Sequence, residues 1–175
     1  YKIWVNSLLT VTFALFAVES FSNEKSLNAI PEHFKTNVHL DLKNPNYAKG
    51  IFQTQEGGIV KGNDYRIQAK EIFYHRDNST TPPTETIIAH EALMMDYGDY
   101  QFVAKRLEFN ISKNEGTLYQ AETKIQGWYI GGDKIDLLPD GSFFIENAHI
   151  TSCESQDKDW EIKIDKVLIS KERIV

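Results

Sequence analysis

Residues 65–74 read YRIQAKEIFY. Tyr65, Ile67 and Ala69 alternate with polar residues, and the alternation then resumes one position late at Ile72 and Tyr74. Strict alternation places apolar side chains on one face of a β-strand. A smooth strand with this delay would turn half of these side chains into solvent. The segment therefore predicts a strand that bends or bulges just after Ala69 and keeps its apolar side chains on the inside.

The same pattern recurs along the chain. Copies with a leading aromatic residue start at Tyr100, Trp128 and Trp160. Shorter forms occupy Ile87, Ala89, Ala92, Met94 and Phe143, Ile145, Ala148, Ile150. A small residue, Ala69, Ala104 or Gly132, precedes the break in the first three full copies, as a crowded corner requires. Repeated strand–corner–strand units predict strands stacked into one continuous bent sheet.

The predicted fold is all-β: a bent, half-open β-jellyroll or β-roll of stacked short antiparallel strands. Turn-forming residues separate the apolar runs at 62–64, 98–99, 114–116 and 139–141. Residues 89–95 (AHEALMM) contain good helix formers, but they are few and lie between strand-like runs. An ordinary β-sandwich is the alternative, and it would require the recurring phase shift to be a coincidence.

The N-terminal residues differ from the rest. Lys2 precedes an apolar run at 3–18, and small residues follow at Ser20 and Ser22. This layout predicts a signal peptide over residues 1–22 and an exported protein, with a membrane anchor as the alternative. Residues 23–56 are interpreted as a linker or weakly ordered lead-in with a short strand near 39–42, and residues 57–175 as the β-domain.

Composition narrows the functional classes. The formal charge of −6 argues against binding to nucleic acid, which needs clustered Lys and Arg. No nucleophile elbow, zinc-protease motif or phosphate-binding glycine loop occurs, and the histidines lack metal-ligand spacing. We therefore expect no enzyme activity, no cofactor and no metal site. The single cysteine, Cys153, is either a small buried residue or has a disulfide partner outside this chain.

Two segments carry a resemblance to a known family. Residues 57–74 begin with Gly57-Gly58-Ile59-Val60 and end in the alternating strand quoted above. Residues 148–153 read AHITSC and are followed by Trp160 and a second alternating strand. Together they resemble the OstA-type domains of lipopolysaccharide-assembly proteins. The resemblance is greatest to the N-terminal periplasmic domain of the LptD family and next to the LptA bridge proteins, and it covers residues 57–175.

The resemblance implies a function. OstA-type domains bind the acyl chains of lipopolysaccharide or a related lipid in an apolar trough and deliver it to the outer membrane. It also implies a location in the periplasm in association with the outer membrane, pairing of edge strands with other Lpt-type bridge domains, an outer-membrane barrel as a further partner, and a disulfide at Cys153. The residues expected to line the trough are Ile67, Ala69, Ile72, Phe102, Ala104, Leu107, Ile130, Ile135, Ile145, Ile150, Ile162 and Val167.

Two other functions compete with lipid transport. A secreted β-sandwich that binds another protein without any lipid would show the same alternation of apolar and polar residues. This alternation alone does not distinguish an open trough from a closed core. A secreted enzyme is the weakest hypothesis, since no convergent set of polar residues is visible in the sequence.

Overall fold

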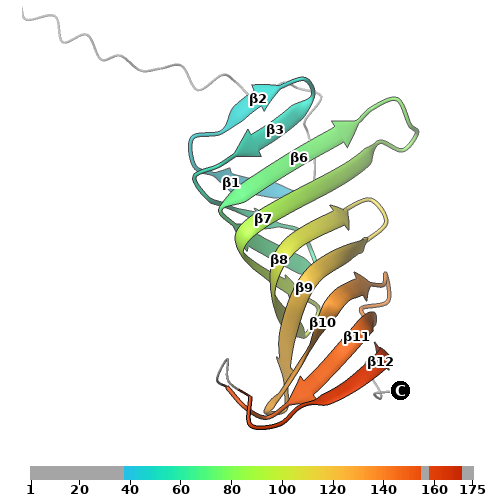
Figure 1. The fold of residues 1–175 in the computed structure, drawn as a ribbon. Coiled ribbons are helices and arrows are strands. Elements are labelled where there is room, and N and C mark those ends of the chain that lie inside the picture. Colours follow the sequence, from blue (N-terminus) through green and yellow to red (C-terminus); the bar gives the residue numbers. More distant parts are fainter. Residues whose placement is uncertain (1–37, 155–157, 171–175) are drawn as a thin grey trace, which may run out of the picture. The chain divides into compact units, whose positions relative to one another are not determined.

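The computed structural model describes residues 38–154 and 158–170, and these residues form strands and turns without a helix. The strands pair into one 12-stranded antiparallel sheet with free edges (Figure 1). This confirms the all-β prediction for the described residues. The strands are β1 (His39–Leu42), β2 (Asn46–Ala48), β3 (Ile51–Thr54), β4 (Gly58–Lys61), β5 (Tyr65–Ala69), β6 (Glu71–Asp77), β7 (Thr84–Tyr97), β8 (Tyr100–Asn110), β9 (Glu115–Ile125), β10 (Trp128–Leu137), β11 (Phe143–Thr151) and β12 (Ile162–Ile169).

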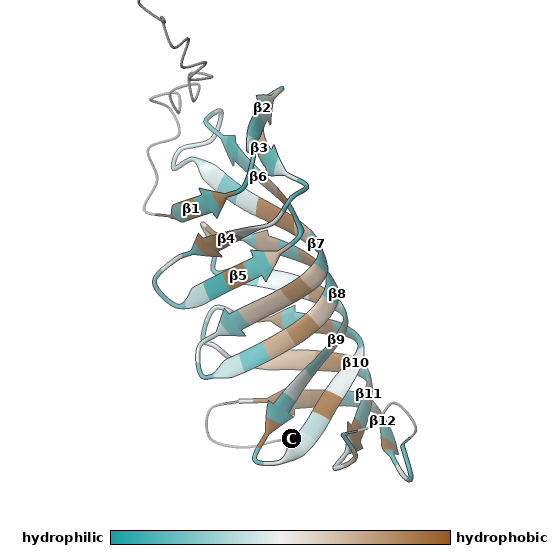
Figure 2. Ribbon diagram, turned by 90° about the vertical axis from the view of Figure 1, so that its left-hand side faces the viewer, coloured by the Kyte–Doolittle hydropathy of each residue, from teal (hydrophilic) through white to brown (hydrophobic). Residues whose placement is uncertain are grey.

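The sheet divides into two half-sheets at a corner that crosses the long strands. The pairing of β7 shows the division, because its residues 94–97 pair with β5 whereas its residues 84–90 pair with β6. We call the first half-sheet β1, β4, β5 and residues 93–97, 100–104, 121–125, 128–132, 148–151 and 162–164. The second half-sheet is β2, β3, β6 and residues 84–90, 106–110, 115–119, 134–137, 143–146 and 166–169. Viewed from the side, the two half-sheets face each other across the core (Figure 2).

Alternate long strands, β7, β9 and β11, cross the corner through residues with left-handed backbone. Gln120 in β9 and Asn147 in β11 have φ values of 48° and 51°. In β10, Gly132 lies one residue before this line, where an added Cβ would be 2.6 Å from the carbonyl oxygen of Glu146. The phase shift predicted for residues 65–74 is confirmed by burial. The inner face contains, all of them buried, Tyr65, Ile67, Ala69, Ile72 and Tyr74.

The prediction was wrong in one strand. The pattern placed Ala92 and Met94 of β7 on the inner face, but Leu93 and Met95 are the buried residues. The reason is a bulge in which Glu91 and Ala92, with φ values of 56° and 47°, lie opposite a single residue of β8. A bulge adds one residue to one strand of a pair, so the side chains beyond it are displaced by one position.

The sheet also begins earlier than the sequence indicated. Residues 39–54, interpreted as part of a linker or lead-in, form β1, β2 and β3, which extend both half-sheets. The short strand expected near 39–42 is confirmed. All three residues of β2 are exposed, so this strand has no apolar alternation that a sequence pattern would reveal. The segment assigned to a signal peptide, residues 1–22, lies outside the described residues.

Aromatic side chains close the core between the half-sheets. Tyr65 of the first half-sheet meets Phe109 of the second edge-to-face, with ring centroids 4.8 Å apart. Phe143 of the second half-sheet contacts both Tyr100 and Phe102 of the first at 5.0 Å. Such edge-to-face contacts add to the hydrophobic stabilisation of a core. The inner face is therefore packed shut along the middle of the sheet.

Candidate functional site

The inner face remains accessible where the sheet ends at β12. Four large apolar side chains are exposed there: Trp128 by 45%, Trp160 by 39%, Ile162 by 53% and Ile164 by 37%. We call these four residues the β12 patch. Ile162 and Ile164 pair with Ile150 and Ala148 of β11, so they continue the inner face to its last strand. No described strand follows β12 in the sheet to cover them.

The two tryptophans of the patch are positioned by their backbone and by contact with each other. Trp128 opens β10 directly after the turn at Gln126 and Gly127, whose φ values are 50° and 89°. Trp160 is fixed through its carbonyl oxygen, which accepts a hydrogen bond of 2.8 Å from the hydroxyl of Thr151. The two indole rings meet edge-to-face with centroids 5.7 Å apart. The result is a preformed apolar surface at the end of the core.

Charged residues occupy the outer face of the same strand. Lys163 and Asp165 alternate with the inward isoleucines, Lys166 follows directly, and all three are exposed. Among the described strands, β12 pairs only with β11, so one side of its backbone is free to bond another strand. Charges on an edge strand discourage indiscriminate pairing, whereas a complementary strand can still be added.

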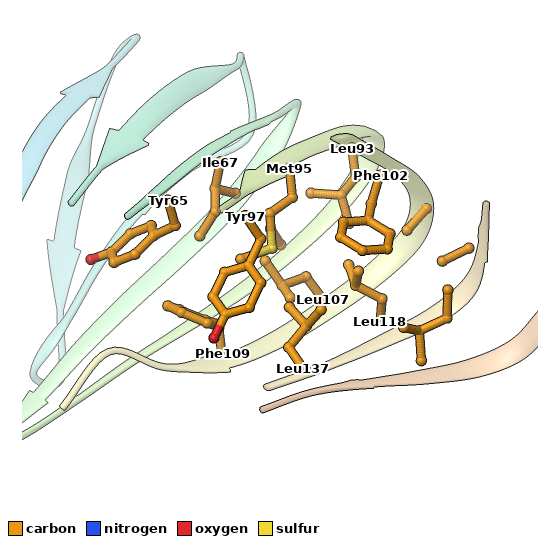
Figure 3. Close-up of a cluster of buried hydrophobic side chains, with 14 of the residues drawn as sticks. Tyr65, Ile67, Leu93, Met95, Tyr97, Phe102, Leu107, Phe109, Leu118 and Leu137 are labelled. Carbon is orange, nitrogen blue, oxygen red and sulfur yellow. The ribbon is translucent and has the colours of Figure 1, made fainter. Parts of the chain in front are cut away.

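The structure brings the predicted trough residues to one inner face, but it leaves few of them accessible. All are buried except Ile150, which is partly buried, and Ile162, which is exposed. Phe102, for example, lies among Leu93, Leu107 and Leu118 with no exposed surface (Figure 3). In this structure most of the expected trough is therefore a filled core, and its exposed member is Ile162 of the β12 patch.

Cys153 lies near the patch, two residues beyond the end of β11. It is partly buried, and its N–H donates a hydrogen bond of 3.1 Å to the hydroxyl of Thr151. Hydrogen bonding to the Thr151 side chain lowers the pKa of the Cys153 thiol, and the nearby backbone reinforces this effect. The negative charge of Asp159 opposes this effect, but the hydrogen bonds, which the sequence does not reveal, outweigh it.

The polar clusters of the outer face form local ion pairs. Lys124 contacts Glu154 at 2.8 Å and the Tyr129 hydroxyl at 2.9 Å. These contacts raise the pKa of Lys124 and lower that of Glu154. They also connect the segment after β11 to strands β9 and β10. Within residues 38–154 and 158–170, no cluster of His, Cys, Asp or Glu is suited to hold a metal ion. The same residues include no helix able to span a membrane.

Comparison with known proteins does not assign the chain to a family. No family model matches it, and no curated protein matches its sequence. The assignment of the β12 patch as the candidate site therefore depends on the geometry of the structure alone. Sequence reasoning included Trp128 and Trp160 in the repeats but did not select them as site residues, because a repeat does not show that its last copy lies at an uncovered end.

Proposed function

We propose that the chain is a lipid-transport domain of the periplasm that binds acyl chains of lipopolysaccharide or a related lipid on its inner face and passes them toward the outer membrane. The observation that carries this proposal is the β12 patch, an exposed apolar surface continuous with a closed apolar core. Leaving apolar surface in water costs about 25 cal/mol per Å². Such patches mark the places where a ligand or a partner binds.

The free edge of β12 supports transfer from one domain to the next. An added strand from an OstA-type neighbour, or from a following outer-membrane barrel, would extend the sheet at this edge. The inner faces of the two domains would then be continuous across the junction. An acyl chain could move between them without its apolar surface returning to water, and this continuity is the physical basis of the proposed transport.

The experiment is site-specific photo-crosslinking in cells. A photoreactive amino acid at Ile162 of the patch is expected to give lipid adducts, because this side chain is both inward and accessible. The matched control is Lys163, the next residue of β12, whose exposed side chain belongs to the outer face. Lipid adducts at Ile162 and not at Lys163 would support the proposal. A folded protein without lipid adducts at Ile162 would contradict it.

A second function is favoured by the closed core. Because Phe102 and Ile130 have almost no exposed surface, the protein is also consistent with an interaction module that binds another protein through the β12 patch without a lipid. The same experiment separates the two functions. A protein-interaction module would give protein adducts at Ile162 in the absence of lipid adducts.

A further inference from the structure

The hydroxyl of Tyr97 joins the two half-sheets on the side opposite the corner. Tyr97 ends β7 in the first half-sheet and is 1% exposed. Its hydroxyl oxygen lies 2.8 Å from the carbonyl oxygen of Asn114 and 2.6 Å from that of Leu138. These carbonyls belong to the β8–β9 and β10–β11 turns of the second half-sheet. A phenol has one proton to donate, so the two carbonyls share it.

On the side with the turns, no described strand runs from one half-sheet into the other. At the corner they are joined by the strands themselves, which run without interruption from one half-sheet into the other. At the turns, backbone hydrogen bonds stay within one half-sheet. Gly98 donates to Asp64 in the first, and Ile111 donates to Glu85 in the second. The Tyr97 hydroxyl therefore bonds across a gap that these backbone bonds leave unbridged.

A cleft bordered by Asn114, one of the two partners of the Tyr97 hydroxyl, separates the turns in one place. It has a volume of about 630 Å³ and lies between residues 62–65 of the first half-sheet and residues 82–85 and 111–112 of the second. Tyr65, which borders the cleft, has a buried hydroxyl with no hydrogen-bond partner among the described residues. Tyr65 and Tyr97 both contact the ring of Phe109, but only Tyr97 bonds the opposite turns.

We propose that Tyr97 is a latch whose hydrogen bonds to the Asn114 and Leu138 carbonyls keep the inner face closed, and whose release lets the two half-sheets part about the corner to admit an apolar guest. The identity of the guest as an acyl chain rests on the proposed function, whereas the opening itself does not. Tyr97 is thus a positioning residue for the trough. The β12 patch is the end of the trough that is accessible even when the Tyr97 hydrogen bonds are formed.

The two methionines of the chain provide a direct test. Met95 is fully buried on the inner face, while the adjacent Met94 lies on the outer face and is partly exposed (Figure 3 shows Met95). The rate of sulfoxide formation at Met95, relative to Met94 in the same molecule, measures access to the inner face. It is followed by mass spectrometry in dilute peroxide at increasing concentrations of urea.

Tyr97→Phe is expected to raise the Met95 rate about tenfold at low urea, the order of effect of one lost buried hydrogen bond. Met94 should not change. The added rate should depend little on urea, because local opening exposes far less surface than global unfolding does. Tyr65→Phe is the matched control and should leave the Met95 rate unchanged. A Met95 rate in Tyr97→Phe that stays at the wild-type value, or rises only with the urea dependence of global unfolding, would overturn the latch.

The lipid experiment is read separately. With the photoreactive residue at Phe102, which is fully buried, Tyr97→Phe should increase lipid adducts, while adducts at Ile162 should not depend on the latch. Faster Met95 oxidation without lipid adducts at either position would support the latch and contradict the proposed function. Adducts at Ile162 with an unchanged Met95 rate would support the function and contradict the latch.

Discussion

The phenol of Tyr97 has an acid–base consequence that can be measured without any ligand. Burial raises the pKa of Tyr97 to about 12 from its ordinary value of 10.0, and the carboxylates of Asp140 and Asp64 add to the effect. The folded state therefore retains this proton in a pH range where the unfolded state releases it. The corresponding stability is complete below about pH 10 and is lost as the pH rises from about 10 toward 12.

We predict that the free energy of unfolding falls steeply above about pH 10, with Tyr97 contributing at most roughly 3 kcal/mol at about 1.4 kcal/mol per pH unit. Urea unfolding followed by circular dichroism at several pH values between about 9 and 11.5 measures the slope. Tyr97→Phe should have a shallower alkaline slope than the wild type. Equal slopes for the two proteins would mean that the Tyr97 proton is not held more tightly in the folded state.

Single residues were well predicted where sterics decide. The sequence identified Ala69, Ala104 and Gly132 as small residues at a crowded corner, and all three are buried there. At Gly132 an added Cβ would also come within 2.5 Å of a methyl group of Ile145. The role of Tyr97 could not be predicted, because its partners are the carbonyls of turns 17 and 41 residues away along the chain. Only the tertiary arrangement brings these groups together.

Among the elements, β7 best shows how a backbone irregularity controls which face is buried. Glu91 and Ala92 take left-handed conformations, which cost a residue with a Cβ atom about 1 to 2 kcal/mol. The extra residue allows Ile87 and Ala89 on one side of the bulge and Leu93 on the other to face the same core. The bulge therefore has a local conformational cost, but it keeps apolar side chains on both sides of it buried in the same core.

We predict opposite behaviour for two alanines of β7. Ala92→Gly should be neutral or stabilising by up to about 1 kcal/mol, because glycine adopts the left-handed conformation without steric cost. Ala89→Gly should destabilise by about 1 kcal/mol or more, since Ala89 is fully buried in regular strand and glycine adds flexibility to the unfolded chain. Urea unfolding of the two variants checks the pair. A loss of stability in Ala92→Gly as large as that in Ala89→Gly would show that the bulge is not a site of strain.

The sequence predicted strands where one face is buried and failed where neither is. β8 and β10 show clear alternation, and their positions follow from it. The exposed β2 is specified only by pairing with β3, so nothing in its composition distinguishes it from a loop. The phase error in β7 has a different origin, because one and two extra residues at a corner give equally plausible apolar patterns.

At the scale of the whole molecule, the sequence predicted which side chains face inward but not how far apart the half-sheets lie. The alternation along a strand assigns each residue to a face, whereas the separation of two faces depends on the size and shape of the side chains between them. Phe143 is central to this closure because it contacts Tyr100 and Phe102 across the core. The half-open trough expected from the pattern is consequently closed at mid-sheet and accessible at β12.

We predict that Phe143→Ala destabilises the protein by about 3 to 5 kcal/mol, the usual cost of removing a buried phenylalanine. It should also leave a cavity between the half-sheets that a small apolar molecule can fill, so benzene should raise the melting temperature of this variant and not that of the wild type. The matched control is Phe144→Ala, whose ring lies on the outer face near the ammonium of Lys166 and should cost far less. Thermal unfolding with and without benzene measures both effects. If Phe143→Ala cost no more than Phe144→Ala and did not respond to benzene, the two half-sheets would not be packed against each other through Phe143, and the closed core would have to be abandoned.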